Sequence, residues 1–571
     1  MILIPSKSKN KQFINSEKPR LFEQFRQKKS WQLQLQNRDG SVDHYYDDDI
    51  VQTIAEEFLD RISVTHLIGD IVRALGGVLG MRPTLSAVQL HSQVLKKIIH
   101  DNKVSRKDVA SFTNILPVDG NSMISFMNGG PMGEHWNTSP NGLYDWIDNK
   151  SSKSIIGIEL GFKADEYGLE VSKRLIAKKQ NNPEVYVGLL IDGFVSAFVP
   201  DPDVIDDFQN KTITMINQMK SVGIDVRIND SWNPLSSDFL AANHVKLWIF
   251  DGKAAFVGGI GIESQFIKTL YDQMDLIQGP FVRTLTLMSF LLMANQRRQL
   301  VDRCDEIQQI YEMDSETIHE KFLPEIAVSG SLSMEISVNV PGYVQDAQKD
   351  YYSLLLRDNV SEIFIMAPYF SDDKIARALI VSAKRLEKKQ SNIFKTQIKS
   401  ENPNISDEEL KNQVTNLLEK NKKVHIIFPK KQENAIIEQV SKYYAHCMKD
   451  ISIVETKQFV VDDGDAIHEM LHAKQMVVVF EKDNKKDYVK FGGSYNPAGR
   501  AHNMWEVNNL TYLKNIDNDD ANLENPVKDY LDNVFWKILN DYSEPFRWGQ
   551  KDVKLNAFEL FMMKFAQVLF F

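Results

Sequence analysis

The sequence contains little cysteine, lacks a long apolar run, and carries no excess of positive charge. Only two of its 571 residues are cysteine, Cys304 and Cys447, so neither a disulfide framework nor a multi-cysteine metal site can be built. This usage fits a reducing compartment, and we expect a cytoplasmic protein. The formal net charge of −10 argues against a nonspecific nucleic-acid binder, which carries a basic footprint, although a local basic groove stays open.

Apolar runs are too short for a membrane span. No stretch reaches the roughly 18 uninterrupted apolar residues that a spanning helix needs. The nearest candidate, residues 63–81, carries Asp70 and Arg73 and is better explained as a buried amphipathic helix. The N-terminal apolar run is too short for a signal-peptide core. Contact with a membrane would be peripheral, and the apolar tail at 546–571 could supply an interfacial helix or a helix docked on the core.

Length and composition predict two large domains with additional segments. The chain is 43% apolar, and its 571 residues exceed the roughly 100–200 residues of one domain. We expect a polar arm over residues 1–45 and a helical segment over 46–115. Two α/β units should follow, at 116–325 and 326–545.

Alternating helix and strand patterns occur twice and indicate a duplicated α/β unit. The first pass contains helices near 141–150, 165–178 and 204–221, strands at 154–161, 185–191 and 224–228, and a hairpin at 244–258. The second contains helices near 345–357 and 432–448, strands at 362–366, 424–428 and 451–454, and a hairpin at 472–492. We therefore expect an α/β fold of two mixed sheets flanked by helices and packed as an intramolecular pseudo-dimer.

A charged insert at about 386–422, rich in Lys, Asn and Glu, interrupts the second unit. Its composition is typical of a solvated helical excursion, and the other interpretation is a cap or a partner surface. Ser371 is expected to cap the helix that leads into this insert. In the first unit, Gly223 should lie just past the end of a helix.

A His-x-Lys pair stands at the start of each predicted hairpin. Side chains two positions apart on a strand share a face, so His244 and Lys246 point the same way, as do His472 and Lys474. We expect the two hairpins to meet between the units and to bring all four side chains into one site.

Acidic residues follow both pairs at related spacings. Asp272 lies 28 residues after His244, and Glu506 lies 34 residues after His472. The six additional residues match the longer turn of the second hairpin. The two acids are therefore candidates for equivalent roles in the two copies.

Together these side chains form a complete set for phosphodiester chemistry, without a metal or another cofactor. One imidazole can attack phosphorus and hold the phosphoryl group covalently. A second can protonate the leaving alkoxide and later activate the acceptor. Ammonium groups and amide donors neutralise the phosphoryl oxygens, and carboxylates behind the imidazoles fix their tautomer and orientation.

The pattern His-x-Lys-(x)4-Asp, followed by a glycine pair, resembles the signature of the phospholipase D superfamily. The first copy matches it in His244, Lys246 and Asp251, and the second matches it in His472 and Lys474. The family implies a phosphohistidine intermediate, and its nucleophile is often the N-terminal histidine. This assigns attack to His244 and acid/base catalysis to His472, an order that the sequence itself does not provide.

Further residues extend the resemblance over about residues 140–545. Ser494 and Asn496 fit the family's Gly-Ser-x-Asn, and Glu506 fits the acid that follows. The stretches 272–280 and 367–370 resemble bacterial cardiolipin synthases. The resemblance implies that Lys246, Lys474, Ser494 and Asn496 bind the substrate phosphate.

Two positions depart from the family pattern. Val479 stands where the second motif aspartate is expected, and Gly261 or Ile262, depending on register, stands where the first copy should hold asparagine. Asp251 followed by Gly252 is also a strong signal for a two-residue hairpin turn. Asp251 is therefore either a catalytic residue or simply a turn residue, and we expect Val479 to perturb local structure more than chemistry.

The expected function is that of a phospholipase D-type phosphodiesterase or phosphatidyltransferase, similar to cardiolipin synthase, with a phospholipid substrate. A nuclease using the same site and a degenerate protein that binds membranes or partners are the alternatives. His468-Glu-x-x-His472 matches a zinc-protease motif. That motif needs both histidines on one helix, whereas the residues after His472 are β-rich.

Overall fold

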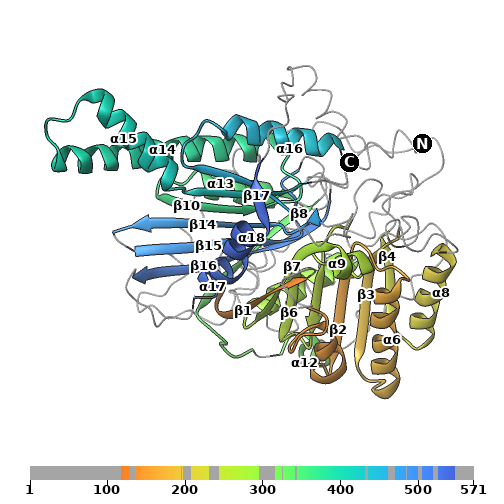
Figure 1. The fold of residues 1–571 in the computed structure, drawn as a ribbon. Helices are drawn as coiled ribbons and strands as arrows, with labels where there is room; N and C mark the ends of the chain where they lie inside the picture. Colours follow the sequence, from red (N-terminus) through yellow and green to blue (C-terminus); the bar gives the residue numbers. More distant parts are fainter. Residues whose placement is uncertain are drawn as a thin grey trace, which may run out of the picture.

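A computed structural model describes residues 118–128, 136–193, 196, 208–229, 243–294, 315–324, 326–340, 344–430, 435–460, 470–483, 485–498, 504–517 and 525–546. The expected arm at 1–45, the helical segment at 46–115 and the tail beyond residue 546 lie outside these residues. Two sheets joined edge to edge, with helices on their faces, make up the described part (Figure 1).

The first sheet is built from seven strands in the order β4-β3-β2-β5-β6-β7-β1. Their bounds are β1 Val118–Asn128, β2 Ser154–Glu159, β3 Tyr186–Asp192, β4 Asp225–Asn229, β5 Leu247–Phe250, β6 Ala254–Gly258 and β7 Leu270–Gln278. β2, β3 and β4 are parallel, and the β5–β6 hairpin adds antiparallel strands. The sheet is therefore mixed, as the alternating pattern predicted.

The second sheet repeats this order as β12-β11-β10-β14-β15-β16-β8. Its strands are β8 Leu332–Val340, β10 Val360–Met366, β11 Val424–Pro429, β12 Val454–Phe459, β14 Gln475–Lys482, β15 Lys485–Gly493 and β16 Glu506–Asp517. β1 also pairs with β8, which joins the two sheets. Short strands β9 Val344–Gln345, β13 Met470–Leu471 and β17 Ser543–Pro545 complete the set. The duplication expected from the sequence is thus visible strand by strand.

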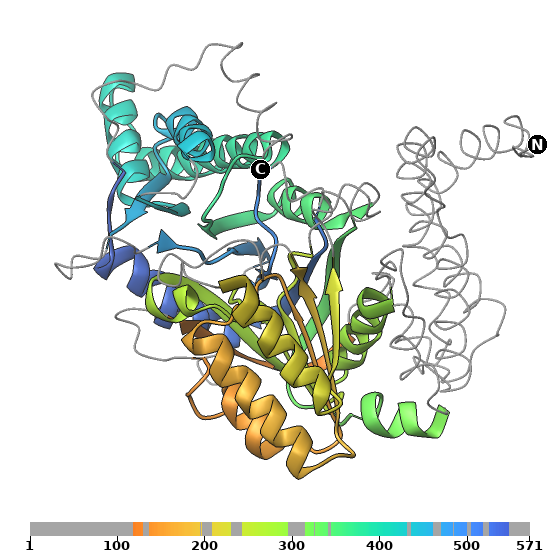
Figure 2. The ribbon, with the colours of Figure 1, turned by 90° about the vertical axis from the view of Figure 1, so that its right-hand side faces the viewer.

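Helices cover the faces of both sheets. The first unit has α5 Leu143–Asp145, the π-helical η3 Trp146–Lys150, α6 Glu166–Asn181, α8 Phe208–Ser221, α9 Ser264–Lys268, α10 Phe281–Ala294 and α12 Ser315–Phe322. The second has α13 Asp346–Leu355, α14 Asp373–Glu401, α15 Asp407–Lys420, α16 Ala435–Met448, α17 Pro526–Tyr530, the π-helical η5 Leu531–Phe535 and α18 Trp536–Asp541. Figure 2 shows α6 and α8 beside each other on one face of the first sheet.

The apolar core continues across the boundary between the units. Leu285 and Met288 of α10 pack in one cluster with Met334 of β8 and Val507 of β16. A second cluster joins Tyr271 of the first unit to the helices after β16. Because burial stabilises by about 25 cal/mol per Å² of apolar surface, this shared core holds the units in a fixed arrangement.

A buried ion pair also crosses the boundary. Lys490 of β15 pairs with Asp275 of β7, and both side chains are almost completely buried. Asp275 also accepts hydrogen bonds from the Ser125 hydroxyl (2.6 Å) and the Gln273 amide (2.8 Å). Removing one partner of such a pair leaves an uncompensated buried charge. The ion pair therefore holds β15 and β7 together.

Two local predictions were wrong. Asp372, not Ser371, caps α14, because its carboxylate accepts from the backbone N–H groups of Lys374 (2.8 Å) and Ile375 (3.1 Å). The strand predicted at 451–454 is β12 at Val454–Phe459. The apolar residues that suggested it, among them Ile451 and Ile453, are buried in the loop before the strand.

The charged insert forms the outer part of a helical hairpin. α14 continues to Glu401, and α15 folds back against it. The pair projects from the body of the second unit (Figure 1). Among the described residues, no helix combines the length and the apolar character needed to cross a membrane.

Candidate active site

The backbone of each His-x-Lys segment is attached to the opposite unit. The N–H of His244 donates to the carbonyl of Trp505 (3.0 Å), and the N–H of His472 donates to the carbonyl of Tyr271 (2.7 Å). Asn243 forms a parallel bridge with Trp505, and β13 pairs in parallel with the start of β7. Each histidine is thus fixed beside the residue that precedes the other unit's candidate acid.

Each acid therefore contacts the histidine of the opposite unit. Nδ1 of His244 lies 3.0 Å from Oε1 and 3.1 Å from Oε2 of Glu506, and Nδ1 of His472 lies 2.6 Å from Oδ2 of Asp272. Spacing along the chain did not reveal this exchange, because it compares residues within one unit. Each imidazole thus has a carboxyl group of the opposite unit at Nδ1, which orients the ring.

The two lysines lie against their own histidines and are almost fully buried. Nζ of Lys474 donates to Oδ2 of Asp272 (3.0 Å) and to the carbonyl of His472 (2.8 Å). Nζ of Lys246 donates to the carbonyl of His244 (2.9 Å). Nζ of Lys474 also lies 2.7 Å from Nδ1 of His472. Because the Asp272 carboxylate can only accept, we assign the Nδ1 proton of His472 to its 2.6 Å bond with Asp272.

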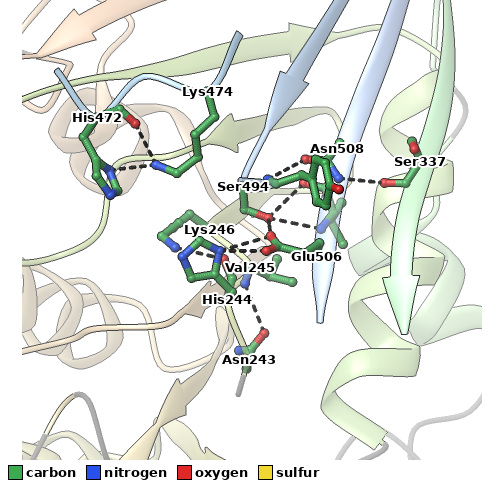
Figure 3. Close-up of polar contacts among 12 residues, drawn as sticks. Asn243, His244, Val245, Lys246, Ser337, His472, Lys474, Ser494, Glu506 and Asn508 are labelled. Carbon is green, nitrogen blue, oxygen red and sulfur yellow. Dashed lines mark hydrogen bonds and ion pairs between the residues drawn. The ribbon is translucent and has the colours of Figure 1, made fainter. Parts of the chain in front are cut away.

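These groups share one electrostatic environment. Burial, and then the nearby ammonium of Lys474, lower the pKa of Lys246 to about 8, against the opposing effect of Glu506, Glu159 and Asp272. The pKa of Lys246 thus depends on charged groups of both units. Figure 3 shows the two His-x-Lys segments and Glu506 gathered at the boundary between the units; that they act as a single site stays a prediction.

The two acids differ in charge. Burial raises the pKa of Glu506 to about 8, although Lys246, Ser494 and Lys474 act in the other direction. Burial would also raise the pKa of Asp272, but the Lys474 ammonium and His472 outweigh it and hold that pKa below its usual range. At neutral pH, Asp272 is a carboxylate and Glu506 is mostly protonated.

Ser494 and Asn496 lie at the end of β15. The Ser494 hydroxyl is hydrogen-bonded to the Glu506 carboxyl, so it supports the acid behind His244; its contact with a substrate phosphate stays a prediction. Asn496 is 8% exposed, and its side-chain oxygen has no hydrogen-bond partner among the described residues. This oxygen is a hydrogen-bond acceptor, and contact of the Asn496 amide N–H groups with a substrate phosphate stays a prediction.

Asp251 lies at the far end of the first hairpin and does not join the site. Its carboxylate accepts from the backbone N–H groups of Ser152 (2.9 Å), Lys153 (2.8 Å) and Ser154 (2.9 Å). Its φ of +52° and the +62° of Gly252 place both in the left-handed region. The turn has three residues rather than two, since Phe250 pairs with Ala254. Asp251 is therefore a turn residue that ties the hairpin to the start of β2.

Val479, at the position of the missing second aspartate, is a core residue. It lies within β14 opposite Tyr488 and is 1% exposed. The second hairpin turns later, at Asp483, which again has a positive φ. The longer hairpin has moved the turn away from this position, so no carboxylate is needed there.

Strand register settles which residue replaces the asparagine in the first unit. Gly258 lies opposite Met274, and Gly493 lies opposite Asn508. Aligning the two units on these pairs puts Gly259 in place of Ser494 and Gly261 in place of Asn496. A Cβ atom on Gly259 would lie 2.2 Å from Oδ1 of Asp272, so this glycine makes room for the acid.

Several contacts were not singled out from the sequence. The rings of Phe266 and Tyr369 stand edge-on to the His472 ring, with centroids 5.5 Å and 6.0 Å away. Glu159 is fully buried, accepts from Nε1 of Trp248 (2.5 Å) and acts on the charge of Lys246. A lone acid at the end of an otherwise apolar strand was the only available signal for Glu159.

The zinc-protease motif does not have the structure it requires. Met470 and Leu471 form β13, and His472 follows outside any helix or strand. His468 lies outside the described residues. Within the described part of the chain, no group of three or more His, Cys, Asp or Glu side chains could hold a metal ion.

The seven-strand order is repeated in the two units, and each unit carries one His-x-Lys hairpin. No protein-family model and no curated protein sequence matches the chain.

Among solved structures, the chain is similar to phosphatidylserine synthase of Haemophilus influenzae Rd KW20, with 15% identity, a TM-score of 0.47, and coverage of 83% of this chain and 97% of that one. Polyphosphate kinase of Porphyromonas gingivalis is 10% identical with a TM-score of 0.36, and the match covers 78% of this chain and 55% of that one. Nuc of Salmonella typhimurium, a phospholipase D family member, is 14% identical with a TM-score of 0.23, and the match covers 38% of this chain and 99% of that one. At these identities the likeness concerns the fold alone.

Proposed function

We propose that the protein is a phospholipase D-type phosphodiesterase or phosphatidyltransferase that acts on phospholipids, similar to cardiolipin synthase. The observation that carries this proposal is the pair of imidazoles, each held by a carboxyl group of the opposite unit. Two buried lysines beside them supply positive charge for a phosphodiester, which is anionic and resists attack. Peripheral contact with a membrane surface is part of the proposal.

The unequal charge of the two acids supports an order of events. We assign attack to His244, whose carboxyl partner Glu506 is mostly neutral: its Nε2 would attack phosphorus and form a phosphohistidine. His472 would act as the acid, with its Nδ1–H held by the Asp272 carboxylate, and its Nε2–H would protonate the leaving alkoxide. His472 then accepts a proton from water or an alcohol, which displaces His244 from phosphorus.

The remaining groups would bind the phosphoryl oxygens. Lys246 and Lys474 face the same charged centre, and the Asn496 amide would complete the set as a neutral donor. Such preorganised donors are strongest in a water-poor site, where charge develops in the transition state. Only the second unit provides an asparagine, so the binding of the phosphoryl oxygens is expected to be lopsided.

We propose phospholipids rather than nucleic acids as substrates because the whole chain is acidic, with a net charge of −10. The family resemblance at residues 272–280 and 367–370 points the same way. Whether water or an alcohol accepts the phosphatidyl group depends on the acceptor, and the product identifies it.

The test is turnover of mixed phospholipid vesicles by the wild type, His244→Ala and His472→Ala, with EDTA present. We expect wild-type activity to survive EDTA and each variant to lose at least about a thousandfold, since each removes a covalent or acid/base catalyst. His446→Ala, on α16 away from the site, is the matched control. Phosphatidic acid as product indicates hydrolysis, and a new phosphatidyl ester indicates transfer.

Absence of lipid turnover by the folded wild type would contradict the proposal. Cleavage of an oligonucleotide instead, with the same dependence on both histidines, would identify a nuclease. Binding without turnover of either substrate would identify a degenerate binding protein.

A further inference from the structure

Helix α14 carries a charge opposite to that of the whole protein. Its 29 residues include eight lysines and arginines and three acids, whereas the chain as a whole has a net charge of −10. Charge of one sign concentrated on one element of an oppositely charged protein is a feature of electrostatic docking surfaces.

Six of the eight cations of α14 form a stripe on its solvent side. Spacings of three, four and seven residues place them on one helix face, and all are exposed: Lys374, Arg377, Lys384, Lys388, Lys395 and Lys399. We call this set the basic stripe. At 1.5 Å per residue it extends over roughly 38 Å. The opposite face packs into the core through residues such as Leu379 and Leu386.

Acidic residues do not neutralise most of the basic stripe. Glu387 lies outside it, and its carboxylate accepts from the backbone N–H of Ser452 (2.5 Å). Among the described residues, Lys384, Lys388, Lys395 and Lys399 form no ion pair. Their positive charge is thus available to an external anionic surface.

The basic stripe begins beside the candidate active site. The Tyr369 ring, edge-on to His472, comes shortly before the helix. The backbone N–H groups of Ser371 and Asp372 donate to the carbonyl of Pro497 (2.9 and 3.0 Å), next to Asn496. A flat anionic surface lying along the stripe would therefore have its near end at the site.

We propose that the basic stripe docks the protein on an anionic phospholipid bilayer. This rests on the proposed function, because the bilayer is then also the source of substrate. Val381, 51% exposed, stands among the cations, and an apolar residue between basic ones suits the headgroup zone of a bilayer. Nucleic-acid surfaces of comparable charge add aromatic side chains for base stacking, and this face of α14 has none.

The docking experiment is co-sedimentation with phosphatidylcholine vesicles, with and without phosphatidylglycerol. The test variant is Lys384→Gln/Lys388→Gln/Lys395→Gln/Lys399→Gln. The control variant changes four exposed lysines on other elements, Lys173→Gln/Lys211→Gln/Lys253→Gln/Lys449→Gln, and alters net charge equally. Each basic residue near an anionic bilayer contributes roughly a fivefold gain in partitioning. We therefore expect the test variant to bind at least about a hundredfold more weakly, with the control close to wild type.

A kinetic measurement separates docking from chemistry. The test variant should lose turnover on anionic vesicles while keeping wild-type turnover of a short-chain phospholipid dispersed as monomers. Vesicle binding that depends on the basic stripe, without turnover of either substrate, would support the docking proposal and contradict the proposed function. Thermal unfolding of both variants checks that they are folded.

Two results would overturn the docking proposal. One is equal binding of the test and control variants to anionic vesicles. The other is loss of binding to a fluorescent oligonucleotide with vesicle binding unchanged, which would make the stripe a nucleic-acid surface.

Discussion

Glu506 and Asp272 occupy equivalent positions in the two units, yet they carry different charges. Asp272 is in direct contact with the Lys474 ammonium and with the His472 ring. Glu506 contacts His244 and the uncharged Ser494, so less positive charge offsets its burial. This difference between single residues sets the roles that we propose for the two histidines.

Glu506 should make stability depend on pH. Its folded-state pKa of about 8 lies above the ordinary value of 4.5, so the folded state binds the proton more tightly than the unfolded state. The stabilisation is complete below pH 4.5 and is lost as pH rises through 8. Glu506→Gln lacks this loss, so its free energy of unfolding should rise relative to wild type by up to about 4 kcal/mol between pH 5 and 8. Chemical denaturation across this range measures it, and a pH-independent difference would contradict the assignment.

Lys246 should limit activity at high pH. Its pKa is lowered to about 8, so the ammonium that would bind the phosphoryl group is lost as pH rises through that value. We expect wild-type kcat/KM to fall above about pH 8. Lys246→Arg should be less active but should keep its activity to higher pH, because guanidinium stays charged. The comparison is a pair of pH–rate profiles, with Glu506→Gln as the control for the other group that titrates there. An unmoved alkaline limb in Lys246→Arg would rule out this role.

At the scale of elements, Asp251 has a structural role in a hairpin turn and no predicted role in catalysis. Its carboxylate holds three backbone N–H groups at the start of β2, at the end of the hairpin opposite the site. Asp251→Ala should destabilise the fold by about 2–4 kcal/mol, since it removes these bonds and a residue that tolerates positive φ. Below the melting temperature kcat/KM should stay near wild type. Asp251→Asn, which keeps one acceptor oxygen, should lose less stability. A large catalytic defect in folded Asp251→Ala would contradict the turn assignment.

The sequence predicted most elements because their apolar periodicity is local. The same reasoning misplaced β12, since Ile451 and Ile453 look like strand residues although they fill the core from a loop. Pairing of His244 with Glu506 crosses between units and leaves no trace in chain spacing. The choice between Gly261 and Ile262 also required the observed strand register. Propensity describes neighbours along the chain, whereas the site depends on contacts between elements far apart in sequence.

At the scale of the whole molecule, neither unit contains a complete site. Each supplies one His-x-Lys pair and the acid for the other, and the boundary is held by the β1–β8 pairing and the buried pair of Lys490 and Asp275. A change that loosens this boundary should affect both histidines together. In the proposed mechanism, one reaction centre therefore needs both copies of the duplicated unit.

The most direct test of this account is to trap the covalent intermediate with a phosphatidyl ester of p-nitrophenol. Its leaving group departs without a general acid, so His472→Ala should release one equivalent of p-nitrophenolate in a burst and carry the phosphatidyl group on His244. His244→Ala should show neither burst nor label. A burst from His244→Ala with label on His472 would reverse the assigned roles, and the absence of a histidine-linked product from both variants and the wild type would contradict the two-histidine mechanism.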